Sequence, residues 1–173
     1  MAITKIQSES LNLADTYAFT GTVTGAGGVN TPAWLVRATT NQTVNDSTAT
    51  QVVFGTEYYD TDNGFASNTY TIPSGEGGKY QINFNVNGYD AGGSLKRVIG
   101  YLYKNDSSVV ETVDDFGSQV MYRINVGCSI VLNLSAGDTL KIYALLDTDD
   151  SSTAAVVGAS EAQTFFGGYK IIE

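Results

Sequence analysis

The amino-acid sequence predicts an all-β protein in which antiparallel strands form a sandwich, and three observations favour this fold. The 173 residues include 19 Gly and 11 Tyr but only 2 Pro, with abundant threonine and valine, a composition typical of strands broken by turns. Several segments place large apolar side chains at every second position. Turn-forming pairs of Gly, Asn and Asp recur at the short spacings of an antiparallel sandwich.

The first predicted strand begins at Trp34, beside Pro32. We expect the indole of Trp34 to be buried against the closing strand at residues 165–169. The clearest strand covers residues 80–87, where amides alternate with the apolar residues Tyr80, Ile82, Phe84 and Val86. One face of this strand is therefore predicted to be buried and the other polar.

Three later segments, residues 130–134, 140–144 and 165–171, repeat the period of two. Intervening positions in or beside them are apolar as well, namely Val131, Tyr143, Leu145, Phe166 and Ile172. Such strands are expected to be covered on both faces, by a second sheet or by a neighbouring subunit. Turns are predicted at five pairs: Asn63-Gly64, Asn87-Gly88, Gly92-Gly93, Asn105-Asp106 and Gly137-Asp138. About eight to ten strands are expected between Trp34 and Ile172.

The first 30 residues differ from the rest. Tyr17, Phe19 and Val23 alternate with small residues, and the glycine-rich stretch 25–28 forms a flexible joint. This segment is too short to build a core of its own. It is either a frayed leader or an anchor that becomes ordered by docking on another surface.

Charge and hydropathy exclude several classes of partner. The net charge of −9 repels phosphate backbones and anionic membranes, so no nucleic-acid partner is expected. No apolar run approaches the 18 residues of a membrane span, and no secretory signal is recognisable at the start.

The chain contains no histidine and one cysteine. This composition removes every Ser-His or Cys-His nucleophile and every zinc site that needs histidine or several thiolates. Cys128 lies in an apolar stretch and is predicted to be a buried, inert thiol. We therefore expect no catalytic centre, no cofactor and no obligatory metal.

Acidic side chains offer two weaker alternatives. Calcium could bind the stretch from Asp60 to Gly64 or the loop from Asp147 to Asp150, but Asx-rich turns and solvated loops are the favoured readings. Carboxylate pairs for glycoside hydrolysis could be drawn from Glu57, Glu111, Asp114 and Asp115, although no sugar platform marks a pair. The adjacent cations Lys96 and Arg97 are expected to start a strand in salt bridges.

A spaced set of residues resembles the signature of the complement C1q-like domain: Phe54, Asp60, Phe65, Ile72, Gly78, Tyr80, Ile82 and Phe84. Ile72 and Ile82 stand where the family commonly has an aromatic residue. Residues 102–106, 134–140 and 166–169 resemble the family in the same order, so the likeness covers roughly residues 32–173. It implies a trimeric jelly roll of the kind shared with tumour necrosis factor. A collagen stalk is not implied, because the chain has no Gly-X-Y repeat.

Residues 3–15 and 19–26 resemble a leader found on tail-fibre and other structural proteins of phages that infect aquatic bacteria. The sequence is thus interpreted as an anchor at residues 1–30, with Tyr17, Phe19 and Val23 as contact residues, followed by a C1q-like jelly roll at residues 31–173. Tyr143, Leu145, Phe166 and Tyr169 are the predicted trimer or core residues.

The function expected from this interpretation is that of a non-enzymatic phage virion protein at the virion surface. It would be a homotrimeric surface fibre, or a decoration of the capsid or tail, that contacts other virion proteins through residues 1–30. The alternative is the receptor-binding head of a short tail fibre, whose partner is a host-surface glycan. A secreted cellular binding module is disfavoured by the missing signal peptide and by the leader.

Overall fold

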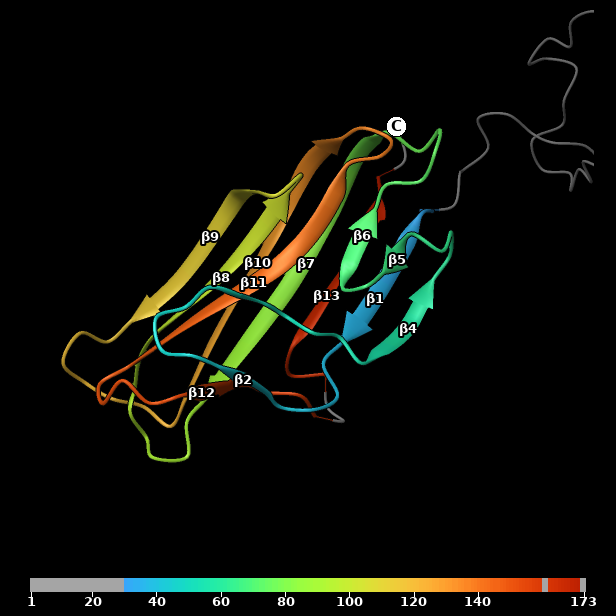
Figure 1. The fold of residues 1–173 in the computed structure, drawn as a ribbon. Coiled ribbons are helices and arrows are strands. Elements are labelled where there is room, and N and C mark those ends of the chain that lie inside the picture. The colour runs from blue at the N-terminus through green and yellow to red at the C-terminus, as the bar shows by residue number, and fades with distance from the viewer. Residues whose placement is uncertain (1–29, 160–161, 172–173) are drawn as a thin grey trace, which may run out of the picture.

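The computed structural model describes residues 30–159 and 162–171, and every regular element within them is a β-strand (Figure 1). The strands are β1 (Ala33–Arg37), β2 (Gln42–Val44), β3 (Thr50–Gln51), β4 (Thr56–Asp60), β5 (Phe65–Ala66), β6 (Thr69–Thr71), β7 (Gly78–Tyr89), β8 (Leu95–Lys104), β9 (Ser107–Asp115), β10 (Arg123–Leu134), β11 (Thr139–Thr148), β12 (Ala154–Val156) and β13 (Phe165–Lys170). The predicted all-β fold is confirmed. The predicted anchor, with Tyr17, Phe19 and Val23, lies outside the described residues.

The described residues contain more strands than the eight to ten predicted. The difference comes from β2, β3, β5, β6 and β12, which span two or three residues each. An alternation of period two cannot be recognised over so few positions.

The strands form two antiparallel sheets. Sheet A has the order β2-β12-β7-β13-β1-β4, with β10 on the other edge of β7, and sheet B has the order β5-β6-β11-β8-β9, with β3 also paired to β11. From β7 onward the chain crosses between the sheets after β7, β9, β10 and β11, so the pairs β7–β10 and β8–β11 are interleaved in chain order and lie in opposite sheets. This alternation between two antiparallel sheets is that of a jelly roll.

The core lies between the two sheets. Along β7 the predicted alternation is confirmed: Tyr80, Ile82, Phe84 and Val86 face inward and are at most 2 % exposed. Sheet B supplies the facing layer from β11, with Leu140, Ile142, Ala144 and Leu146. Trp34 is fully buried, and its ring packs edge-on against Phe166 of the closing strand, as predicted.

One predicted turn is wrong. Asn87 and Gly88 continue β7 instead of ending it, and Gly88 pairs with Ile124. A Cβ atom at Gly88 would lie 2.7 Å from Cγ2 of Val98, so the glycine serves close packing between the sheets. The four other predicted turn pairs lie outside the strands, between consecutive elements.

The sandwich has two distinct ends. At the proximal end, the amide of Lys170 donates to the carbonyl of Pro32 at 2.9 Å, so the start of β1 lies beside the end of β13. The loops at residues 90–94, 116–122 and 149–153 lie at the opposite, distal end (Figure 1). No helix long and apolar enough to cross a membrane occurs among the described residues.

Candidate functional site

The aspartate-rich stretch after β4 is a turn closed by its own side chains. Asp60 Oδ2 accepts a hydrogen bond from the amide of Phe65 at 2.7 Å, and Asp60 Oδ1 accepts one from the amide of Asp62 at 3.4 Å. Asp62 Oδ2 accepts a hydrogen bond from Thr61 Oγ1 at 2.5 Å. This geometry is the Asx-rich turn favoured from the sequence.

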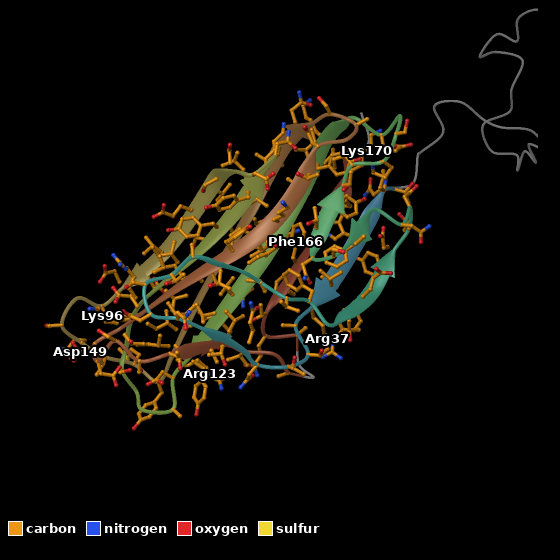
Figure 2. All side chains as sticks on the ribbon, in the orientation of Figure 1. Arg37, Lys96, Arg123, Asp149, Phe166 and Lys170 are labelled. Carbon is orange, nitrogen blue, oxygen red and sulfur yellow. The ribbon has the colours of Figure 1, made fainter. Side chains whose placement is uncertain are left out.

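Asp147 is bound by two cations of sheet B. Its carboxylate lies 3.0 Å from Arg97 Nη2 and 3.4 Å from Lys96 Nζ, which confirms the predicted salt bridges of this basic pair. Lys96 and Asp149 both lie toward the distal end (Figure 2). Within residues 30–159 and 162–171, no three His, Cys, Asp or Glu side chains are grouped so that they could hold a metal ion.

The four carboxylates considered for glycoside hydrolysis are divided between the two sheets. Glu111, Asp114 and Asp115 lie on β9, an edge strand of sheet B. Glu57 lies on β4, the edge strand of sheet A on the far side of the sandwich. A hydrolytic pair needs two carboxyl groups within about 10 Å of each other on either side of one bond.

Cys128 is less buried than predicted. It lies on β10, where it is half-buried and packs against the core. The difference arises because β10 pairs with β7 alone and therefore forms an edge of sheet A.

The outer face of sheet A carries an apolar band toward its β4 edge. Leu35, Phe165, Tyr59 and Tyr169 surround a hollow of about 330 Å³. Tyr59 is 50 % exposed and Tyr169 is 39 % exposed. This outward band is a candidate interface, because large exposed apolar side chains gathered in one place are typical of protein contact surfaces.

A glycine shapes this band. A Cβ atom at Gly167 would lie 3.0 Å from Cδ1 of Leu35 and 2.7 Å from the carbonyl oxygen of Trp34. Because Gly167 has no side chain, β1 and β13 approach closely and Leu35 lies across the strand pair.

Toward β10 the outer face of sheet A is mostly polar, although Val131 is exposed there. Asn85 Nδ2 donates to Asn125 Oδ1 at 2.8 Å, and Gln81 Nε2 donates to Ser129 Oγ at 2.8 Å, so amides link β7 to β10. Arg123 lies over the ring of Tyr89, with 5.2 Å between its Cζ atom and the ring centroid. The apolar band thus has a hydrogen-bonded polar border, an arrangement common at interfaces.

The four residues predicted for the trimer or the core lie in three different places. Phe166 is fully buried in the core, and Tyr169 is part of the band on sheet A. Tyr143 and Leu145 point outward from sheet B and are partly exposed. Their apolar character alone placed them together in the prediction, whereas the register of β11 and β13 assigns them to different faces of the two sheets.

Three tyrosines gather on the outer face of sheet B. Tyr101 pairs with Tyr143 across β8 and β11, and the rings of Tyr103 and Tyr143 have centroids 4.5 Å apart. The rings of Tyr101 and Tyr103 are 6.1 Å apart and perpendicular. From the sequence, Tyr103 was predicted only as part of the stretch 102–106 and Tyr101 was not predicted at all, although their i, i+2 spacing on one strand was a usable signal.

The loop at residues 116–122 exposes four large apolar side chains at the distal end: Phe116, Val120, Met121 and Tyr122. Its backbone is fixed, because the amide of Met121 donates to the carbonyl of Leu95 at 2.7 Å. Tyr122 is 65 % exposed although its ring lies against Gly93, which has a φ of +74°. This apolar loop, absent from the sequence analysis, is a second candidate contact surface.

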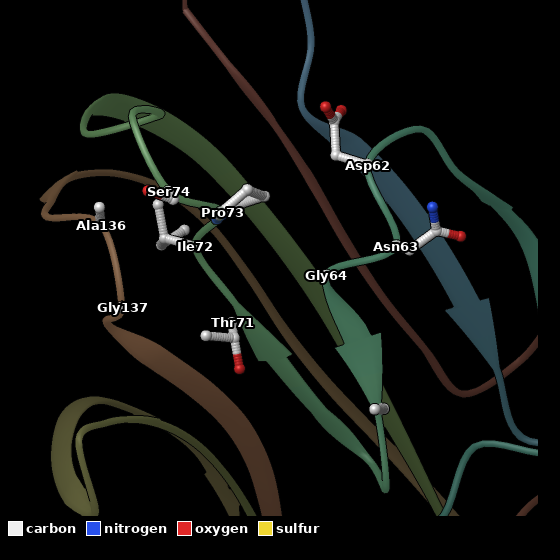
Figure 3. Close-up of a pocket in the computed structure, with 10 residues that line it drawn as sticks. Asp62, Asn63, Gly64, Thr71, Ile72, Pro73, Ser74, Ala136 and Gly137 are labelled. Carbon is white, nitrogen blue, oxygen red and sulfur yellow. The ribbon is translucent and has the colours of Figure 1, made fainter.

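A hollow of about 630 Å³ opens at the proximal end (Figure 3). It is bounded by the turn from Asp62 to Gly64, by residues 71–74 and by residues 136–137. The amide of Ala33 donates to Thr61 Oγ1 at 2.9 Å, so β1 begins beside this hollow.

Comparison with known proteins identifies the fold. No family model and no curated protein matches the sequence. Among solved structures, the globular domain of the zebrafish complement 1qA protein is similar, with a TM-score of 0.55 and 20 % identity over 82 % of this chain and 98 % of that one. The Eiger TNF of S. frugiperda has a TM-score of 0.61 and 13 % identity over 82 % and 92 % of the two chains. Murine APRIL at pH 5.0 has a TM-score of 0.56 and 13 % identity over 80 % and 99 %.

The chain therefore has a C1q/TNF-like jelly-roll fold. The sequence resemblance to the C1q-like domain is confirmed at this level, and identities of 13 to 20 % establish the fold alone.

Proposed function

We propose that this protein is a non-enzymatic structural component of a phage virion, a homotrimer of jelly rolls at the virion surface. Residues 1–30 attach it to other virion proteins, and it serves as a short fibre or as a decoration of the capsid or tail. The apolar band on sheet A is the observation that supports the trimer. The resemblance of residues 3–15 and 19–26 to a phage leader supports the assignment to a virion.

The band is suited to contact with other copies of the chain. It presents two half-exposed tyrosine rings, Tyr59 and Tyr169, around a hollow that one protomer alone leaves open. Covering such a surface removes apolar area from water at about 25 cal/mol per Å². Closed rotational symmetry lets each copy cover its neighbour without forming a filament, and the family resemblance favours three copies.

The two ends of the sandwich fit attachment at one end and display at the other. Residues 31–33 and the hollow near Asp62 lie together at the proximal end. Surface display from an anchor at residues 1–30 would then point the distal loops away from the particle.

Light scattering on the full chain tests the trimer. The expected mass is about three times the chain mass of 18.4 kDa. Tyr169→Glu should yield monomers, because it inserts a charge into the covered band. Val113→Glu, which adds the same charge to an exposed position on sheet B, should stay trimeric. A native chain that is monomeric at high concentration would contradict the trimer.

Virion incorporation tests the anchor. A variant that lacks residues 1–28 should form folded trimers and be missing from purified particles. The full chain, expressed in the same way, should be incorporated. Normal occupancy of the truncated protein on particles would show that attachment runs through the jelly roll instead.

The apolar distal loop favours a second candidate function, the receptor-binding head of a tail fibre. The loop at residues 116–122 lies at the end where a host surface would be met, and its side chains Phe116 and Tyr122 are exposed. In that case the purified protein should inhibit phage adsorption, and Tyr122→Ser should reduce the inhibition. Equal inhibition by the native protein and the variant, or none by either, would count against this candidate.

A further inference from the structure

The tyrosine cluster on sheet B, formed by Tyr101, Tyr103 and Tyr143, is an ordered aromatic platform. Neighbouring rings lie 4.5 and 6.1 Å apart, within the range of favourable aromatic pairs. Tyr143 comes from the centre of β11, and Tyr101 and Tyr103 come from the second half of β8, its long paired neighbour. The rings are therefore positioned by the sheet and not by a loop.

Apolar residues lie beside the cluster on the same face of sheet B. Ile99 lies on the same outer face, opposite Leu145 of β11 and Val113 of β9, and is only 7 % exposed. All three tyrosines are partly buried, so each keeps part of its ring open to solvent. Burial, followed by the charge of Glu111, raises the pKa of Tyr101 above its ordinary value.

The charges on this face exclude an anionic ligand. Lys141 Nζ lies 2.5 Å from Asp106, and Arg97 is held by Asp147 at 3.0 Å. Glu111, opposite Tyr101, has no ion-pair partner within the described residues. Nucleic acids and sulfated glycans also stack on aromatic rings, but they need unpaired cations for their anionic groups. The net charge of −9 of the chain repels them as well.

We propose that the tyrosine cluster binds an extended, neutral oligosaccharide. Pyranose rings present C–H groups to aromatic faces, and tyrosine combines such a face with a hydroxyl that donates and accepts hydrogen bonds. The Glu111 carboxylate accepts hydrogen bonds from sugar hydroxyls at one end of the row. This inference rests on the proposed function, because a trimer joined through sheet A leaves sheet B facing outward.

Calorimetric titration of the full chain with two neutral linear hexasaccharides, maltohexaose and cellohexaose, tests the proposal, with dextran sulfate as an anionic probe. We expect binding of at least one neutral hexasaccharide and none of dextran sulfate. Tyr103→Ala should weaken binding about tenfold, because a stacked ring is lost. Tyr103→Phe should retain most of the affinity. Tyr58→Ala, which removes a 51 % exposed tyrosine on β4 of sheet A, is the matched control and should bind like the native chain.

Three outcomes would overturn the inference. They are no binding of either hexasaccharide at millimolar concentration, preferential binding of dextran sulfate, and a loss of affinity in Tyr58→Ala but not in Tyr103→Ala. Light scattering on the same samples separates this inference from the proposed function. If the protein is a trimer that binds no sugar, the sugar site is refuted and the proposed trimer stands. If it is a monomer whose sugar binding depends on Tyr103, the trimer is refuted and the sugar site stands.

Discussion

Trp34 and Tyr70 stack face to face across the sandwich, with ring centroids 3.5 Å apart and planes at 10°. Trp34 comes from β1 in sheet A and Tyr70 from β6 in sheet B, and both are fully buried. Phe166 packs edge-on against the same indole. This pair joins the two sheets through residues from an edge region of each, and truncating Trp34 to Ala should cost about 3–5 kcal/mol.

The Tyr70 hydroxyl makes no hydrogen bond to any described residue although it is buried. Burial, followed by the charges of Asp60, raises the pKa of Tyr70 well above its ordinary value. Tyr70→Phe removes an unpaired polar group while keeping the stack, so the free energy of unfolding should stay the same or rise by about 1 kcal/mol. Urea denaturation measures this change.

Tyr80→Phe is the matched control. The Tyr80 hydroxyl donates to the carbonyl of Glu76 at 2.6 Å, so losing it should lower the free energy of unfolding by about 1 kcal/mol. If Tyr70→Phe proves as destabilising as Tyr80→Phe, an ordered water must satisfy the Tyr70 hydroxyl.

Gly168 should tolerate no side chain. A Cβ atom there would lie 2.6 Å from Cη2 of Trp34 and 2.7 Å from the carbonyl oxygen of Gln81, and backbone cannot yield as a flexible side chain can. Gly168→Ala is expected to cost about 2–3 kcal/mol in thermal or urea unfolding. Gly117→Ala, at a φ of +61° with no atom within 4 Å, should cost about 1 kcal/mol. Equal losses in the two variants would mean that the strand pair relaxes around the added methyl group.

Asp138 should make the free energy of unfolding depend on pH in the acidic range. Hydrogen bonds from Lys104 first, and then from Ser135 and Asn105, lower the pKa of Asp138 to about 2. Because the folded-state pKa lies below the unfolded value of 3.8, the stabilisation is complete above about pH 4 and is lost as the pH falls through 2.

Asp138→Asn should therefore lower the free energy of unfolding by about 1–2 kcal/mol at pH 7, and the difference from the native chain should vanish near pH 2. Asp114→Asn, at an exposed position on β9, is the control and should change little at either pH. A difference for Asp138→Asn that persists at pH 2 would show that the carboxylate charge is not its source.

Removing divalent metal should leave the melting temperature unchanged. The oxygens of Asp60 already accept two backbone amides, and those of Asp147 face Arg97 and Lys96. Thermal melts in excess chelator and in millimolar calcium should superimpose. A large stabilisation by calcium would place an ion at one of these turns after all, since a ligand of the native state raises its stability.

The sequence predicted the long strands well and the short ones poorly. Residues 80–87 alternate over eight positions, so period two identified β7 and its buried face. Tyr70 was not predicted to be a core residue because β6 spans only Thr69–Thr71. The ring of Tyr70 nevertheless forms half of the stack with Trp34. At Asn87 and Gly88, tight packing against sheet B overrode the local preference of the pair for a turn.

The candidate surfaces depended on information that a single sequence does not carry. Tyr101 and Tyr143 are 42 positions apart in the sequence and become neighbours only through the register of β8 and β11. The sequence marked Tyr143 as an intervening apolar residue of the trimer or the core, but it could not reveal that two other tyrosines complete a cluster. Long-range strand register is set by the whole core, so local patterns underdetermine it.

The hydrogen bond between Lys170 and Pro32 means that the polypeptide enters and leaves the sandwich at neighbouring points. A domain with this geometry can be inserted into a surface loop of an unrelated carrier protein without distorting the domain or the carrier. Joining the two points with a short linker and opening the chain at the exposed turn between β8 and β9 gives a circular permutant with both sheets intact. Cargo fused after β13 would project from the proximal end and leave the distal loops unobstructed.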